Sequence, residues 1–342
     1  MIVEARGSGS LDDFASGWTT LRGQLSLGES MSRHTSWRVG GPAQRAYRPA
    51  DLQDLAAFLA GLPADEPVLF VGLGSNLLVR DGGIQGTVIF THGILKTLGL
   101  DPDRKGVLYA EAGVASPKVA RFTAMCGLQG AEFLSGIPGT VGGALAMNAG
   151  CYGQQTWEIV EEVLTVDRDG ELRKRPGRQF AVGYREVTLK PRYWETSVEG
   201  RERDSLGGEW FVAAWLRLRS GEREAARERI RALLTRRVAT QPLDRPNAGS
   251  VFRNPPGDFA ARLIEACGLK GQRLGNAQIS AKHANFIVNL GGARAADIEA
   301  LMDWAERSVA ERFGIRLERE VRVVGESRAP TSPETGGAAG ER

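Results

Sequence analysis

The segment that decides the fold reads SGIPGTVGGALAMNAG and spans residues 135–150. Its glycines and alanines would let a short helix lie close to a bulky ligand, and Ser135 and Thr140 add side-chain donors. A helix N-terminus carries partial positive charge and free N–H groups, which suit a pyrophosphate. We therefore expect one wall of a nucleotide-cofactor site here, although small residues on a helix are more often packing devices.

A second glycine-rich loop, GLGSN at residues 72–76, directly follows an apolar strand. Glycines in such a loop let successive backbone N–H groups converge on one anion, and Ser75 and Asn76 add donors. One loop of this kind is more often only a tight turn, but two in one chain favour a bound nucleotide cofactor. Neither loop is a GxGxxG after the first strand, which disfavours a Rossmann dinucleotide site, and the absence of GxxxxGK[ST] excludes a P-loop.

Outward from these loops the pattern alternates between strands and helices, as in an α+β or α/β protein with three parts. Asp51 is the expected N-cap of a helix over residues 52–62, and Ser116 that of a helix with Pro117 at its first position. Asp169-Gly170 predicts a hairpin. The expected strands are 37–47 (interrupted by a turn at 40–42), 67–71, 77–79, 87–90, 107–111, 160–166, 171–175, 211–218, 285–289 and 317–324, and the other expected helices are 117–126, 221–238, 259–267 and 295–313.

The bulk properties exclude several classes of function. The chain has 342 residues, enough for two or three domains, and its net charge of +3 does not favour nucleic acid or an anionic membrane. Its three cysteines and three histidines are dispersed, without CxxC, HxH or HExxH spacing, so we expect no disulfide framework and no metal site. No signal peptide or membrane span is expected, and the natural setting is the reducing cytoplasm.

Seven sequence blocks occur in order over roughly residues 20–325 and resemble those of the UDP-N-acetylenolpyruvoylglucosamine reductase family. The number of separate blocks makes the resemblance specific. The blocks are VGGPA (39–43), GLGSNLLV (72–79), EFLSGIPGTVGGALAMNAG (132–150), GYR (183–185), GSVFRNP (249–255), LIEACGLKG (263–271) and EVR (320–322).

The resemblance implies an α+β fold: an FAD-binding fold of the vanillyl-alcohol oxidase and p-cresol methylhydroxylase type, followed by a C-terminal α/β substrate domain. The chain is similar to the subtype without the family's Tyr-bearing insertion, because the passage from Leu218 to Ser250 holds only a helix. The expected organisation is a flexible extension (1–17), FAD-binding subdomain 1 (18–84), FAD-binding subdomain 2 (85–220) with a surface loop near 191–209, a substrate-binding domain (221–325) and a disordered tail (326–342).

The same resemblance implies the chemistry. NADPH reduces a non-covalently bound FAD, and the reduced flavin converts UDP-N-acetylglucosamine enolpyruvate into UDP-N-acetylmuramate, a peptidoglycan precursor. Ser250 then protonates the carbanionic carbon, Arg185 pairs with the substrate's carboxylate or enolate charge, and Glu320 polarises the substrate or relays the proton. From position alone these residues would be interpreted as a turn serine, an exposed arginine and a strand surface charge.

The remaining family positions carry over residue by residue, with two departures. Thr240 stands where the family usually has a lysine, so Arg236 or Arg237 is the expected substitute, and Val187 stands where a serine is common. His283 lies in a family-like stretch, where a structural role is as plausible as a nucleotide contact. The expected cofactor contacts are Gly72, Gly74, Ser75, Asn76, Leu77, Ser135, Gly136, Ile137, Pro138, Gly139, Thr140, Gly142, Gly143, Ala144, Asn148, Ala149, Gly150, Arg237 and Arg322, and the expected substrate contacts are Tyr184, Arg253, Asn254, Gln241 and His283.

Two alternatives remain open. A flavin oxidase or dehydrogenase of the wider superfamily would often carry a histidine for covalent flavin attachment near the first phosphate loop, and none flanks residues 72–79. A non-enzymatic flavin-binding module would be expected to lose Ser250, Arg185 or Glu320, and all three are present. A monomer is expected, with no nucleic-acid or membrane partner.

Overall fold

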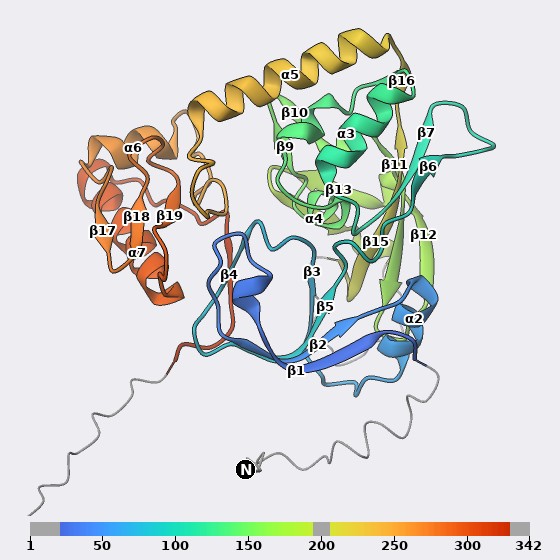
Figure 1. The fold of residues 1–342 in the computed structure, drawn as a ribbon, viewed down its shortest axis with the longest axis horizontal. Helices are drawn as coiled ribbons and strands as arrows, with labels where there is room; N and C mark the ends of the chain where they lie inside the picture. Colours follow the sequence, from blue (N-terminus) through green and yellow to red (C-terminus); the bar gives the residue numbers. More distant parts are fainter. Residues whose placement is uncertain (1–20, 194–205, 329–342) are drawn as a thin grey trace, which may run out of the picture.

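The computed structural model describes residues 21–193 and 206–328. The extension expected over residues 1–17 lies outside these residues, as do residues 329–342 and most of the loop expected at 191–209. No helix in the described part of the chain is long and apolar enough to cross a membrane. Figure 1 shows the N-terminal sheets on one side and the C-terminal elements on the other, with the long helix α5 (Arg223–Thr240) running between them.

The first layer is a four-stranded mixed sheet in the order β1-β2-β5-β3. β1 pairs antiparallel with β2, whereas β2, β5 and β3 run parallel. The apolar side chains of helix α2 pack in a core shared with this sheet and the second one. The Asp51 carboxylate accepts a hydrogen bond from the Asp54 N–H, which confirms the predicted N-cap. The elements are β1 (Gln24–Ser30), β2 (Pro42–Arg48), α2 (Leu52–Ala60), β3 (Val68–Val71) and β5 (Ile84–Phe90).

The strand expected from residue 37 is wrong at its beginning, because β2 starts only at Pro42. Arg38 and Gly40 have φ values of 58° and 129°, which are incompatible with an extended strand. β1 was not expected from the sequence. Its side chains are mostly exposed, so the alternation that marks a half-buried strand is weak.

The second layer is a five-stranded antiparallel sheet in the order β12-β11-β15-β7-β6. The predicted hairpin around Asp169-Gly170 is confirmed as β11 and β12. α3, α4 and the first half of α5 contribute to the apolar core that this sheet carries. The elements are β6 (Leu98–Leu100), β7 (Val107–Glu111), α3 (Ser116–Met125), α4 (Val141–Ala146), β11 (Val160–Asp167), β12 (Leu172–Pro176) and β15 (Glu209–Arg217), with the short pairs β8 (Leu128–Gln129) and β16 (Arg219–Ser220), and β9 (Gly150–Cys151) and β10 (Gln154–Gln155).

The predicted cap of α3 is wrong by one residue. The cap position is Ala115, and Ser116 is the first helical residue. The Ser116 N–H donates to the Gly139 carbonyl, which ties the start of α3 to the loop before α4. A backbone carbonyl therefore satisfies the N–H group at this helix end, and the serine side chain does not act as the cap.

The C-terminal part combines two helices with a small antiparallel sheet in the order β17-β18-β19. The helix expected over 295–313 is confirmed as α7, and that over 259–267 as the slightly shorter α6. The sequence missed the β17–β18 hairpin, whose strands have only two and three residues. The elements are α6 (Ala260–Ala266), β17 (Arg273–Leu274), β18 (Ala277–Ile279), β19 (Ile287–Asn289) and α7 (Ala295–Phe313).

The end of the chain returns to the N-terminal part. Of the strand expected over 317–324, only β20 (Arg322–Val324) is strand, and it pairs parallel with β4 (Leu77–Val79). Glu326, which was expected to begin the tail, is hydrogen-bonded to Gly82 and Gly83. β4 and β20 thus form a two-stranded seam between the two sides of the molecule (Figure 1).

A shared core reinforces this seam. Trp37 is fully buried among residues of α6, α7 and β19, and its indole N–H donates to the Ile287 carbonyl at 2.7 Å. In return, the Asn289 side-chain amide donates to the Trp37 carbonyl at 2.9 Å. The C-terminal part is therefore packed on the N-terminal part through apolar side chains as well as through strand pairing.

Candidate active site

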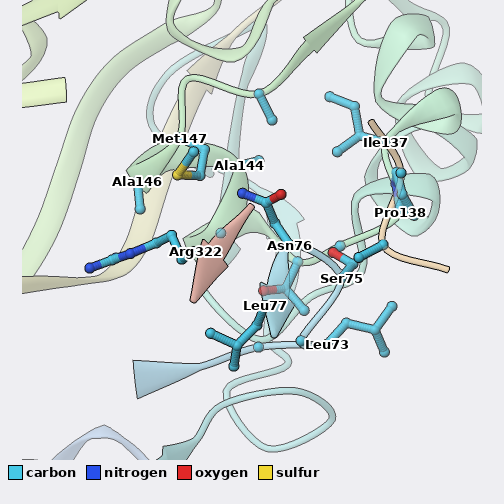
Figure 2. Close-up of a pocket in the computed structure, with 18 of the residues that line it drawn as sticks. Leu73, Ser75, Asn76, Leu77, Ile137, Pro138, Ala144, Ala146, Met147 and Arg322 are labelled. Carbon is cyan, nitrogen blue, oxygen red and sulfur yellow. The ribbon is translucent and has the colours of Figure 1, made fainter. Parts of the chain in front are cut away.

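A large cavity lies where the two glycine-rich loops, the seam and the C-terminal part meet. Its empty volume is about 1300 Å³, part of which is open to solvent. Figure 2 shows Ser75 and Asn76 from one loop opposite Ile137, Pro138 and Ala144 from the other. The sequence-predicted residues that line the cavity are Gly72, Gly74, Ser75, Asn76, Leu77, Ile137, Pro138, Gly139, Thr140, Gly143, Ala144, Ala149, Gly150, Arg185, Arg237, Gln241, Ser250, Glu320 and Arg322.

The first loop connects β3 to β4 and has no room for side chains at its glycines. A Cβ on Gly72 would lie 2.3 Å from Thr140 Oγ1, and one on Gly74 would lie 2.0 Å from the His34 carbonyl oxygen. Gly74 also has a φ of 62°, which favours glycine. The loop is therefore built so that its main chain can approach both the second loop and a bound ligand.

The second loop uses part of its main chain internally. The Val141 and Gly142 N–H groups donate to the carbonyls of Val114 and Ala112, so they are not free for a ligand. A Cβ on Gly142 would lie 2.9 Å from Ala112 Cβ, and Gly142 does not line the cavity. Its position fits a packing role against the end of β7. The expected pyrophosphate donors at the start of α4 are thus fewer than the sequence indicated.

One observation in particular indicates that the residues of the two glycine-rich loops are suited to holding FAD. The Thr140 side chain is 1% exposed, and its hydroxyl has no hydrogen-bond partner among the described residues. Thr140 also lines the cavity at the point where the two loops meet. A buried hydroxyl without a partner costs free energy, and an acceptor on a bound ligand would satisfy it. The Ser135 hydroxyl is likewise buried without a partner, although Ser135 does not line the cavity.

Asn76 connects the first loop to the far end of the chain. Its side-chain amide donates to the Glu320 carbonyl at 3.0 Å, and its own carbonyl accepts from the Arg322 N–H at 3.1 Å. The side chain expected to donate to a phosphate is therefore occupied with a backbone partner. Asn76 places the backbone of Glu320 beside the glycine loop.

Arg185 occupies a tight turn that aims it into the cavity. Tyr184 and Arg185 form the two-residue connection between β13 (Phe180–Gly183) and β14 (Glu186–Leu189), and Arg185 has a φ of 57°. This left-handed conformation is uncommon for arginine and is typical of strained positions at functional sites.

Arg185 and Glu320 form a buried ion pair on the cavity wall. Arg185 Nε lies 2.6 Å from Glu320 Oε1, and the side chains are 18% and 11% exposed. Burial raises the pKa of the Glu320 carboxyl above its ordinary value, whereas the Arg185 and Arg253 charges act to lower it. Desolvation dominates, so Glu320 can hold a proton at a higher pH than an exposed glutamate.

Ser250 reaches the same cavity on a loop that is tied to Glu320. The Glu320 N–H donates to the Val251 carbonyl at 2.8 Å, and the Val251 N–H donates to the Asn285 carbonyl at 2.9 Å. The Asn285 side chain accepts from the Phe252 N–H and donates to the Phe252 carbonyl. Asn285 was not expected at the site. It does not line the cavity and supports the Ser250 loop only through hydrogen bonds to the loop backbone.

Arg237 brings positive charge to the cavity from the last turn of α5. Its Nε donates to Gln241 Oε1 at 3.0 Å, and no carboxylate of the described part of the chain forms an ion pair with it. Burial lowers the pKa of the Arg237 guanidinium. A half-buried cation without an acidic partner among the described residues suits an anionic ligand. Thr240, at the family's lysine position, instead donates to the Arg236 carbonyl.

Several expected contacts lie outside this cavity. Asn148 and Tyr184 line a separate neighbouring cavity, and Tyr184 is 53% exposed. The Asn254 side chain accepts from the Ala260 N–H at the start of α6. The buried His283 Nδ1 has no hydrogen-bond partner in the part of the chain that the structure describes, and the ring packs against Phe286. The expected residues that do not line the main cavity are Ser135, Gly136, Gly142, Asn148, Tyr184, Arg253, Asn254 and His283.

The sequence missed the apolar wall of the cavity. Some of these residues lie inside the quoted motifs and others lie outside them, on β3, before the Ser250 loop and before β19. Only their adjacency to the expected contacts could have indicated them. They are Leu69, Phe70, Val71, Leu73, Met147, Ala248, Gly249 and Phe286, whereas Ala146 was expected beside the ligand and lines the cavity.

Substituting Gly72 with alanine is expected to weaken cofactor binding. The new Cβ would displace Thr140, and overpacking of this kind typically costs about 1–3 kcal/mol. If that strain falls on the cofactor site, the affinity for FAD drops roughly tenfold to a hundredfold. The ratio of flavin absorbance to protein in the purified enzyme measures this. The control is Gly99→Ala on β6, where a Cβ meets nothing within 4 Å. Full flavin content in Gly72→Ala would contradict the role of the loop at 72–76 in holding the cofactor.

Comparison with known proteins places this site in a family. Residues 43–175 match the family model described as an FAD binding domain, and residues 241–324 match that of the UDP-N-acetylenolpyruvoylglucosamine reductase, C-terminal domain. The UDP-N-acetylenolpyruvoylglucosamine reductase of Thiobacillus denitrificans is 56% identical over 317 residues, covering 90% of this chain and 94% of the relative. That of Nitrosospira multiformis is 54% identical over 328 residues, covering 94% of each chain.

A solved structure agrees. The crystal structure of UDP-N-acetylenolpyruvylglucosamine reductase from Thermus caldophilus aligns with a TM-score of 0.71 at 33% identity, covering 89% of this chain and 99% of that one. The FAD-binding fold and the cavity between its glycine loops and the C-terminal part define an FAD-dependent oxidoreductase. More narrowly, the chain belongs to the UDP-N-acetylenolpyruvoylglucosamine reductase family.

Proposed function

We propose that the protein reduces UDP-N-acetylglucosamine enolpyruvate to UDP-N-acetylmuramate, using bound FAD and NADPH as the reductant, in the synthesis of peptidoglycan precursors. The observation that carries this proposal is that the Arg185–Glu320 pair and Ser250 line the same cavity as both glycine-rich loops. We further propose that the enzyme acts as a cytoplasmic monomer, with residues 18–84 and 85–220 holding FAD and residues 221–325 holding the sugar nucleotide.

The loops at 72–76 and 135–150 would hold the cofactor. Ser75 and the Thr140 hydroxyl are the side-chain donors that remain available there, and Arg322 lies beside the loop through its pairing with Asn76. Bound FAD supplies the hydride chemistry, which no amino-acid side chain can provide. Arg237 suits the diphosphate of the cofactor, because it has no acidic partner among the described residues, and Gln241 beside it would contact the substrate.

The chain's own residues would handle charge and protons. Hydride addition to the terminal CH₂ carbon of the enolpyruvyl ether leaves an enolate, whose negative charge the Arg185 guanidinium is placed to stabilise. The Ser250 hydroxyl then gives its proton to the carbon that carries the ether oxygen, which completes the lactyl ether. Glu320 orients Arg185 and either polarises the substrate or relays a proton, a role that its raised pKa suits.

Steady-state oxidation of NADPH, with and without UDP-N-acetylglucosamine enolpyruvate, tests the proposal. We expect NADPH oxidation that depends on the enolpyruvate and stops when it is exhausted. Equal rates with and without the enolpyruvate would instead indicate an oxidase of the wider superfamily that passes electrons to oxygen.

A further inference from the structure

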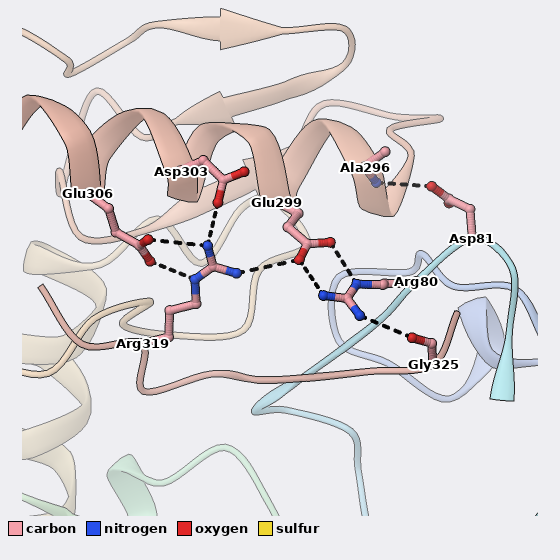
Figure 3. A network of polar contacts seen from close by, with 8 residues as sticks. All are labelled: Arg80, Asp81, Ala296, Glu299, Asp303, Glu306, Arg319 and Gly325. Carbon is pink, nitrogen blue, oxygen red and sulfur yellow. Dashed lines mark hydrogen bonds and ion pairs between the residues drawn. The ribbon is translucent and has the colours of Figure 1, made fainter. Parts of the chain in front are cut away.

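Arg319, the residue before Glu320, is held by three carboxylates on one face of helix α7. Its Nε lies 2.6 Å from Glu306 Oε1, its Nη2 binds Asp303, and its Nη1 lies 3.5 Å from Glu299 Oε1. Figure 3 shows this guanidinium enclosed by the three acids. The Arg319 side chain is only 25% exposed, and the Glu306 carboxylate, followed by that of Asp303, raises its pKa.

Glu299 is shared with an arginine from the other side of the molecule. Arg80, directly after β4, donates to both carboxylate oxygens of Glu299 at 3.0 and 2.8 Å, and to the Gly325 carbonyl at 3.3 Å. Its neighbour Asp81 accepts the N–H groups of Ala295 and Ala296 at 2.9 and 3.0 Å. Asp81 therefore caps α7 from the N-terminal part, where a negative charge is favourable.

The backbone around Arg319 transmits this restraint to Glu320. Arg319 forms a bridge with Phe252, and the Glu318 carbonyl accepts from the Arg253 N–H. In extended chain, successive side chains point to opposite faces. Arg319 accordingly points to α7, while Glu320 points to Arg185 and the cavity.

We propose that Arg319 is a positioning residue for Glu320. Arg80, which also binds Glu299, connects Arg319 to the part of the chain that carries the first glycine-rich loop. The carboxylates of α7 bind Arg319, so the extended chain around Arg319 and Glu320 cannot rotate. Glu320 therefore stays aligned with Arg185. Arg80 and Asp81 lock the same helix to the end of β4, so the alignment is maintained relative to the cofactor loop. This inference rests on the proposed function, since it concerns the same reaction.

A network of partly buried, multidentate ion pairs is suited to this task. Isolated surface ion pairs contribute little to stability, but a guanidinium with several carboxylates has a defined geometry. Arg104 offers a matched comparison, because it binds Asp101, Glu161 and Glu162 at 27% exposure on the second sheet and does not line the cavity. If these networks served stability alone, the two arginines would be equivalent in their effect on catalysis.

The experiment uses the FAD-bound enzyme without oxygen and compares Arg319→Met with Arg104→Met. We expect Arg319→Met to slow reoxidation of the reduced flavin by the enolpyruvate about tenfold or more, because small displacements of a catalytic group are costly. Flavin reduction by NADPH should stay within about twofold of wild type, since it does not need the Glu320 alignment. Arg104→Met should match wild type in both half-reactions. Arg319→Lys, which keeps the charge, should recover part of the lost rate.

The pH profile of the reoxidation rate provides a second test, because a change in folding stability alone would not shift it. Arg185 acts to lower the pKa of Glu320, so loosening this pair lets that pKa rise further. The ion pair with Arg185 needs ionised Glu320, so the acid limb of the profile should move to higher pH in Arg319→Met and stay in place in Arg104→Met. Glu306→Gln removes one carboxylate and leaves Arg319 in place, so it should shift the acid limb in the same direction by less. This variant replaces Arg319→Met in the experiment if Arg319→Met does not fold.

The outcomes separate the two proposals. If the enolpyruvate does not reoxidise the reduced flavin of the wild-type enzyme, both the proposed function and the proposed role of Arg319 are wrong. If wild type is reoxidised but Arg319→Met and Glu306→Gln behave as Arg104→Met does in rate and pH profile, the positioning role alone is overturned.

Discussion

Replacing Ser250 with alanine is expected to leave the reduction of FAD by NADPH unchanged and to slow reoxidation by UDP-N-acetylglucosamine enolpyruvate roughly 10²-fold or more. The two half-reactions need different groups. Reduction by NADPH transfers hydride and needs no proton donor at the substrate carbon. Reoxidation ends in protonation of that carbon, and the Ser250 hydroxyl is the donor that the loop at 249–250 presents to the cavity.

Rapid mixing of each half-reaction separately, with flavin absorbance as the signal, measures this difference. Ser308→Ala on α7 is the matched control, because Ser308 is also partly buried but does not line the cavity. It should match wild type in both half-reactions. Equal slowing of both half-reactions by Ser250→Ala would mean that Ser250 shapes the cavity and does not donate the proton.

Replacing Arg185 with methionine is expected to lower kcat/KM for the enolpyruvate roughly 10²-fold or more, as loss of one transition-state charge contact does. Two consequences combine. The developing enolate loses its guanidinium partner, and the buried Glu320 loses the cation that acts to lower its pKa. Because that pKa then rises, Glu320 becomes protonated at a higher pH, and activity that needs its charge should be lost from the acid side first.

Steady-state kinetics across pH measure both effects. Arg185→Lys should recover only part of the rate, because lysine keeps the charge without the planar fork. Arg178→Met is the control for charge, since Arg178 is an exposed arginine of the same region outside the cavity. A normal kcat/KM for the enolpyruvate in Arg185→Met would contradict the assigned role.

The parts of the site that could be predicted from the sequence are those carried by contiguous loops. Gly72, Thr140 and their neighbours line the cavity because each loop needs small residues at fixed spacing, and that spacing is local. The long helix α7 was predictable to the residue because its apolar positions keep a helical period from end to end.

What could not be predicted is where a side chain points once distant segments meet. Asn76 was expected to contact the cofactor, but its amide reaches the Glu320 backbone, 244 residues away in the chain. Gly142 was expected at the ligand and packs on Ala112 instead. Trp37 was expected in a strand and lies in the core of the C-terminal part. No local pattern contains information about such partners.

The same limit applies to the end of the chain. The segment LEREVRVV at 317–324 indicated a strand, but its partner β4 and the restriction of the strand to Arg322–Val324 depend on the folded arrangement. The Arg319 network is equally non-local, because Arg80, α7 and Arg319 meet only in the folded protein. The arginine would otherwise be interpreted as one more charge on a strand.

One anaerobic single-turnover measurement tests the central claim most directly. The purified protein is reduced with one equivalent of NADPH and then mixed with UDP-N-acetylglucosamine enolpyruvate while the flavin spectrum is followed. We predict that the oxidised FAD spectrum returns and that one UDP-N-acetylmuramate forms per flavin. Flavin that stays reduced until oxygen is admitted, or a purified protein that carries no flavin, would contradict the account.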